Sequence, residues 1–351
     1  MPTLHQLQQQ FGNNLVILPV TSDAHGKAEQ FLRENKHMKG LKMLSVVDNG
    51  SLKKSFPHGS IPHYAWLDAG PSLSAVTGTD QLTPDNIAKA ISGDRVALAE
   101  KLNINVDNPD PLFLDGDLLD TELLQYALLV KGQHLGLSTF HIARQKRGVV
   151  NGRMCTNFPL LVMYETVARR LFKSIGERYS TKRLLIESDR PEYLSYGLSN
   201  GEVEEETWNR SNLYSYDIVV PLQTAGQLDS LILRMLNGCS GYNGTMVYTN
   251  TKCYVLRERA GFRAEHNDST GAPDTPGSRR LMLALNHPDV TRLPVIDESH
   301  FNGISPIALE KVKGLPLNAI NEKLDSVGLE LVEEERRMAM FAIRDNDTPL
   351  N

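Results

Sequence analysis

A proline at the entrance to an apolar strand is the feature that most constrains the fold of this chain. Residues 60–68 read Ser-Ile-Pro-His-Tyr-Ala-Trp-Leu-Asp, and a Gly-Pro turn and a second short apolar run follow. Two short strands separated by turn residues predict a β-hairpin. An X–Pro bond costs only about 0.5–1 kcal/mol to hold cis. We expect a cis bond at Ile61–Pro62; the alternative is a trans proline at an ordinary strand entrance.

Helices and strands are predicted to surround this hairpin in the first 93 residues. Leu4, Leu7 and Phe11 recur at helical spacing, and Gly12 ends that helix. The apolar run over residues 15–20 predicts a central strand buried on both faces. The other predicted elements are a helix at 27–38, strands at 64–67 and 72–77, and a helix that Thr83 caps, Pro84 begins and Gly93 ends, with Ile87, Ala90 and Ile91 inward.

Residues 1–93 resemble the C-terminal two-thirds of a TlpA-like thioredoxin domain. The resemblance rests on Met1-Pro2 before an amphipathic helix, on Ile61-Pro62 at the family's cis-proline position, and on the hairpin and helix that follow. It implies a thiol–disulfide oxidoreductase of the periplasm or cell envelope, in which the Ile61–Pro62 backbone contacts an extended substrate. The family's Cys-x-x-Cys and first strand are not in this sequence, and the resemblance places them upstream of Met1. We therefore predict no catalytic residue and no dithiol exchange.

The three cysteines of the chain supply no redox pair. Cys155, Cys239 and Cys253 match neither a Cys-x-x-Cys motif nor a zinc-binding spacing. Disulfide exchange needs a reactive thiolate. One interpretation is that the cysteines are buried and structural. The alternative is a disulfide between Cys239 and Cys253, which flank a predicted turn.

Charge and composition argue against several partners and ligands. The 351 residues carry a net charge of −5 and no basic stripe of the kind that binds nucleic acid. No apolar run approaches the ~20 residues that span a bilayer, and residues 1–6 lack the features of a signal peptide. His25, His58 and His63 fit no metal-ligand spacing, and neither a phosphate-binding loop nor a nucleophile elbow is present. We expect no metal and no cofactor, and interpret the histidines as surface or loop residues.

The whole chain is predicted to be a mixed α+β or α/β protein in several parts. Predicted helices at 159–172, 228–236 and 317–327 each carry one apolar stripe, so each should cover one face of a sheet. Predicted strands lie at 184–186, 216–220, 246–256 and 329–343, with a solvated acidic loop at 202–206, a turn at 242–245 and a charged interruption at 333–337. The last helix and strand are expected to bury Leu317, Ile320, Leu324, Leu329, Leu331, Met340 and Phe341 on one side.

The predicted parts are a partial thioredoxin-like domain (1–93), a linker (94–111), an α+β module (112–259), a mobile loop (260–278) and a C-terminal α+β lobe (279–351).

From about Gly152 onward the chain resembles a module of unknown function common in soil bacteria. In Bacteroidetes-type envelope proteins this module often follows a TlpA-like domain. The resemblance rests on residues 157–160, 216–220, 231–236, 294–298 and 328–331. It implies an exported protein whose partners are cysteine-containing or envelope proteins. Because no acid–base pair or nucleophile is visible in the module, the alternative to an oxidoreductase is a non-enzymatic binding protein.

Overall fold

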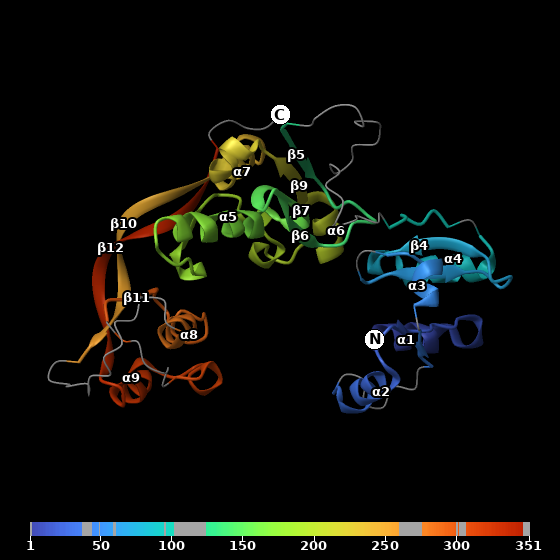
Figure 1. Cartoon of the computed structure of the whole chain (residues 1–351), viewed down its shortest axis with the longest axis horizontal. Coiled ribbons are helices and arrows are strands. Elements are labelled where there is room, and N and C mark those ends of the chain that lie inside the picture. The colour runs from blue at the N-terminus through green and yellow to red at the C-terminus, as the bar shows by residue number, and fades with distance from the viewer. Residues whose placement is uncertain are drawn as a thin grey trace. The chain divides into compact units, whose positions relative to one another are not determined.

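The protein is mixed α+β, as predicted, and divides into two compact units in a computed structural model (Figure 1). The structure describes residues 2–36, 44–48, 50–58, 61–94, 96–101, 124–259, 276–299, 301 and 307–346. Most of the predicted linker and of the predicted mobile loop lies outside the described residues. The first unit comprises Met1–Gln145, Arg153–Phe158 and Leu213–Val219, and the second comprises Lys146–Gly152, Pro159–Asn212 and Val220–Asn351.

The hairpin after Pro62 is confirmed. Strand β3 (Tyr64–Leu67) pairs antiparallel with β4 (Leu73–Thr77), and the Ile61–Pro62 bond is cis. Trp66 Nε1 donates to Thr77 Oγ1 at 2.8 Å across the pair. Helix α4 (Pro84–Ser92) follows, with the Thr83 hydroxyl accepting from the backbone of Asn86 and Gly93 in the left-handed region. These ends match the prediction because cap and turn residues act locally.

Burial in this segment differs from the prediction. The apolar run at 15–20 is not a buried strand. Of its residues only Val20 belongs to a strand, β1 (Val20–Thr21), which pairs in parallel with β2 (Val46–Val47), and Val16 is 67% exposed. An apolar run is buried on both faces only where other layers cover it, and nearby sequence does not decide that. Other elements are α1 (Pro2–Phe11), α2 (His25–Glu34), which ends before the predicted 38, and α3 (Ser51–Ser55). Of the three apolar residues assigned to the inner face of α4, Ile87 is buried, whereas Ala90 and Ile91 are exposed.

Most of a four-stranded sheet also belongs to the first unit, and only one of its strands was predicted. Its order is β5-β9-β7-β6. Asn157, held at φ +53°, ties this sheet to a loop: its side-chain amide donates to His134 O and Leu137 O and accepts from His134 N. The strands are β5 (Tyr126–Lys131), β6 (Phe140–Lys146), β7 (Val149–Pro159) and β9 (Leu213–Val219).

The second unit is organised around a long antiparallel ribbon. Strands β10 (Tyr242–Glu258) and β12 (Leu329–Asp345) have 17 residues each and pair along their whole length (Figure 1). Two short strands extend this pair in parallel: β11 (Val295–Asp297) joins β10, and β8 (Leu184–Glu187) joins β12. The predicted turn at 242–245 is therefore strand. The charged patch at 333–337 does not interrupt β12, since its backbone pairs without a slip with residues 250–254 of β10. Lys252 and Glu333 also form an exposed ion pair across the ribbon.

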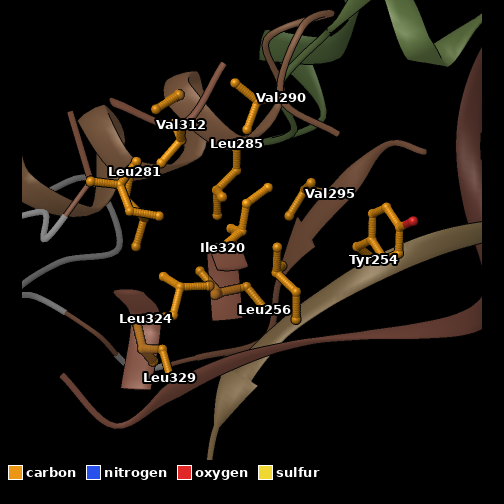
Figure 2. Close-up of a cluster of buried hydrophobic side chains, with 13 residues drawn as sticks. Tyr254, Leu256, Leu281, Leu285, Val290, Val295, Val312, Ile320, Leu324 and Leu329 are labelled. Carbon is orange, nitrogen blue, oxygen red and sulfur yellow. The ribbon is translucent and has the colours of Figure 1, made fainter. Parts of the chain in front are cut away.

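Helices cover the two ends of this ribbon. The predicted helices correspond to α5 (Leu160–Ser174), α7 (Leu228–Cys239) and α9 (Leu317–Asp325), and α8 (Pro276–Leu285) is an additional helix. Figure 2 shows Leu256, Leu285 and Ile320 converging between α8, α9 and the ribbon. The acidic run at 202–206 is not all loop, since Glu205 begins α6 (Glu205–Asn212).

Met340 is not on the side of β12 assigned to it. Successive strand residues point to opposite faces. Met340 packs with Cys253 and Val255 on one face, whereas the ring of Phe341 lies near Tyr164 of α5.

No helix among the described residues is long and apolar enough to cross a membrane.

Candidate functional site

The predicted substrate-contact segment, Ile61–Pro62, is an exposed loop with an anchored backbone. Ile61 is 79% exposed. The Pro62 carbonyl accepts a hydrogen bond from Lys101 Nζ at 2.7 Å. The backbone of Lys101 donates in turn to Val76 O of β4 at 2.8 Å. Lys101 thus joins the loop to the hairpin, and its burial lowers the pKa of its ammonium group.

Two histidines stack beside this loop. The rings of His58 and His63 have centroids 4.6 Å apart and lie within 25° of parallel. His58 Nδ1 lies 3.0 Å from Phe56 O. Burial, and secondarily the nearby His58 and Lys101, lowers the pKa of His63 to about 4. His63 is therefore neutral at pH 7, and its two ring nitrogens are enclosed without a hydrogen-bond partner among the described residues.

The turn of the hairpin is fixed by one carboxylate. Asp68 Oδ1 accepts from the backbone of Gly70 at 2.9 Å and of Ser72 at 2.8 Å. Ser74 Oγ donates to Trp66 O at 3.0 Å on the adjacent strands. With the contact between Lys101 and Pro62, these bonds fix both ends of β3, and Ile61 is exposed at the entrance of the hairpin. No group of three His, Cys, Asp or Glu side chains able to hold a metal ion occurs in the described part of the chain.

The three cysteines do not form a redox pair. None of the three is part of a disulfide, so the Cys239–Cys253 bond is not formed. Cys155 and Cys253 are buried, but Cys239 is exposed at the end of α7, which corrects the interpretation of three buried thiols. Burial raises the pKa of Cys253. A buried, protonated thiol is a poor nucleophile, so the structure offers no reason to assign redox chemistry to Cys253.

A buried ion pair in the first unit was not predicted. Arg144 of β6 donates from Nε and Nη2 to the two carboxylate oxygens of Asp217 in β9, at 2.9 and 2.7 Å. The Asp217 side chain is fully buried. Burial and the carboxylate of Asp217 together raise the pKa of Tyr126. The available signal was the single aspartate within the apolar sequence of residues 213–220, because a buried carboxylate needs a cationic partner.

Lys182 is a half-buried cation that the sequence did not indicate. Its Nζ donates to His287 O at 3.0 Å, to Leu285 O at 3.4 Å and to Thr291 Oγ1 at 2.6 Å. Leu285 is the last residue of α8, so the lysine caps that helix with a positive charge. Burial lowers the pKa of Lys182 to about 8. Because three oxygens lie within hydrogen-bond distance of its Nζ, we interpret Lys182 as a structural cap.

Comparison with known proteins adds no assignment, since no protein-family model, no curated protein and no solved structure matches the chain.

Proposed function

We propose that this chain is a thioredoxin-like, TlpA-type protein of the cell envelope whose Ile61–Pro62 segment contacts the backbone of an extended protein substrate. One observation supports this proposal most. Ile61 is 79% exposed, and the carbonyl of the next residue, Pro62, is held by a hydrogen bond from Lys101. An exposed apolar side chain on a fixed backbone gives a peptide both contact area and a preorganised surface.

The second part of the proposal is that the 351-residue chain does not itself exchange disulfides. Its sequence contains no Cys-x-x-Cys pair. Two of its three thiols are buried, and the exposed one, Cys239, belongs to the second unit. The same observations favour the alternative, a non-enzymatic envelope binding protein, in which the loop binds peptide without any redox step.

Peptide binding tests the contact. We expect a fluorescein-labelled unfolded peptide with one cysteine to bind the full chain, and Ile61→Asp to weaken binding at least tenfold. Leu67→Asp is the matched control, because Leu67 is also apolar and 54% exposed, at the far end of β3. Equal binding by both variants would contradict a contact at Ile61.

Insulin reduction tests the redox part separately. We expect a rate no higher than that of an equal concentration of free thiol. A higher rate that disappears in Cys239→Ser would identify an unconventional redox site and reject the proposed inactivity. Binding without reduction favours the non-enzymatic alternative over the oxidoreductase.

A further inference from the structure

The ribbon of the second unit has the geometry of a local twofold axis. Its register runs without a slip from Tyr242 opposite Asp345 to Glu258 opposite Leu329, with Asn250 opposite Arg337 at the middle. A twofold rotation about this middle pair exchanges the two strands. It relates every residue of β10 to the residue 87 positions later in β12, as Tyr242 to Leu329.

The two added strands obey the same symmetry. Strand β11 pairs in parallel with residues 254–256 of β10, beginning at Tyr254. Strand β8 pairs in parallel with residues 341–344 of β12, beginning at Phe341. Phe341 is 87 positions after Tyr254, so the rotation that exchanges β10 and β12 also brings β11 onto β8. The register within the ribbon does not require this agreement.

The helices and turns repeat in the same order. Helix α7 leads through Gly241 into β10, and α9 leads through Gly328 into β12, with both glycines at positive φ, 77° and 72°. Nine residues (175–183) join α5 to β8, and nine (286–294) join α8 to β11. The order helix, short strand, helix, long strand therefore occurs twice, and in the first copy α6 and β9 are inserted between the short strand and the second helix.

Matched side-chain contacts bind each long strand to its preceding helix. The Asn237 side chain accepts from Gly244 N and donates to Gly244 O, at 2.9 Å in both cases. The Asn321 side chain accepts from Leu331 N at 2.7 Å and donates to Leu331 O at 3.0 Å. Gly244 and Leu331 are again 87 positions apart, the third residue of each strand. Asn237 and Asn321 are 84 positions apart, so the two helices make this contact from positions that differ by three residues.

We infer that the second unit contains two copies of one helix–strand unit that exchange the halves of their long strands. The first lobe comprises α5, α7 and β8 with the first half of β10 and the second half of β12. The second lobe comprises α8, α9 and β11 with the remaining halves. Each lobe thus has a core that is incomplete without a strand begun in the other, and the two lobes fold as one cooperative unit.

In each lobe, the core contains residues from both long strands. In the first lobe, Gly244 of β10 lies so close to Tyr164 of α5 and Phe341 of β12 that a Cβ there would meet their rings at 2.7 and 2.9 Å. In the second, Leu256 of β10 and Leu329 of β12 belong to one cluster with the residues of α8 and α9 (Figure 2). Both long strands therefore contribute to both cores.

A direct contact also joins the lobes away from the ribbon. Lys182 lies in the α5–β8 connection of the first lobe, and its three acceptors lie at the end of α8 and in the α8–β11 connection of the second. Lys182 lies two residues before β8, and the residue two positions before β11 is Leu293. Leucine has no group that could donate these hydrogen bonds, so this contact is made once.

Native-state hydrogen exchange on the full chain tests the inference. Ile232 of α7 is 0% exposed and Ile320 of α9 is 1% exposed, one in each core. Cutting either side chain back to alanine removes several buried carbons. We expect Ile232→Ala and Ile320→Ala each to lower the protection of amides in both β8 and β11 by a similar factor, about 30-fold or more. Leu283→Ala, at a site on α8 that is 61% exposed, should change neither.

Protection lost only in the lobe that carries the substitution would overturn the inference. If an alanine variant does not fold, Ile232→Val and Ile320→Val give the same comparison with a smaller loss. An experimental structure in which the rotation of β10 onto β12 fails to bring β11 onto β8 would independently reject the duplication.

Discussion

Arg144 and Asp217 show how strongly one pair of side chains constrains the first unit. The two groups make a bidentate ion pair that crosses from β6 to β9, and 10% of the Arg144 side chain is exposed. Removing one partner leaves the other buried with an uncompensated charge.

We expect Asp217→Leu to destabilise the first unit by about 3–5 kcal/mol, because Arg144 then loses its carboxylate. The double variant Arg144→Met with Asp217→Leu should recover much of that loss, since two apolar side chains can pack in the same space. Urea unfolding measures both. A double variant no more stable than Asp217→Leu would mean that the charge of Arg144 is not the source of the cost.

His63 makes the stability of the first unit depend on pH. Its pKa is about 4 in the folded protein and 6.5 when the chain is unfolded. Between these values the unfolded state binds more protons, so stability falls as the pH is lowered from 6.5 towards 4. His58 and Lys101 are the charged or titratable groups that contribute to this shift.

We expect the free energy of unfolding to drop by about 1–2 kcal/mol between pH 7 and pH 5, allowing for the partial exposure of the ring. Urea unfolding followed by Trp66 fluorescence, in a Trp208→Phe background, measures it. The drop should shrink in His63→Phe, which keeps a stacking ring without a titrating group, and persist in His25→Phe, a change at an exposed site. An unchanged drop in His63→Phe would assign it to other groups.

At the scale of elements, one glycine decides how closely α5 packs on the ribbon. No space for a side chain exists at Gly244, whereas a Cβ at Gly238 of α7 meets nothing within 4 Å. We expect Gly244→Ala to lower the melting temperature, at a cost of about 1–3 kcal/mol. Gly238→Ala is the matched control and should be neutral or stabilising by up to about 1 kcal/mol, because alanine favours a helix. Equal melting temperatures for the two variants would contradict the close contact.

At the scale of the whole molecule, thiol accessibility reports whether both units are folded. Cys155 belongs to the first unit and Cys253 to the second, and both are buried, whereas Cys239 is exposed. We expect a thiol reagent to titrate one cysteine in the native chain and three in denaturant. Cys239→Ser should remove the fast reaction alone. Rapid reaction of two thiols in the native chain would show that Cys155 or Cys253 is accessible, which contradicts its burial.

Local residue patterns by themselves determined the ends and types of many elements. Thr83 and Pro84 begin α4, Gly93 ends it, and the Asp68 turn joins β3 to β4, because capping and turn chemistry act within a few residues. The apolar stripes of α5, α7 and α9 likewise predicted these three helices. The resemblance to TlpA-like domains located Ile61–Pro62 as the loop of interest, and its role stays a proposal.

Only the tertiary structure decided which strands pair and which surfaces are covered. The run at 15–20 is apolar, yet none of its residues is buried and Val16, Leu18 and Val20 are exposed. The charged stretch at 333–337 continues β12 rather than breaking it. Arg144 and Asp217 are 73 positions apart, and Lys182 and Thr291 are 109 apart. Hydrogen bonds between strands and the burial of charges depend on such distant partners, whose meeting is a property of the folded chain and not of any short stretch of sequence.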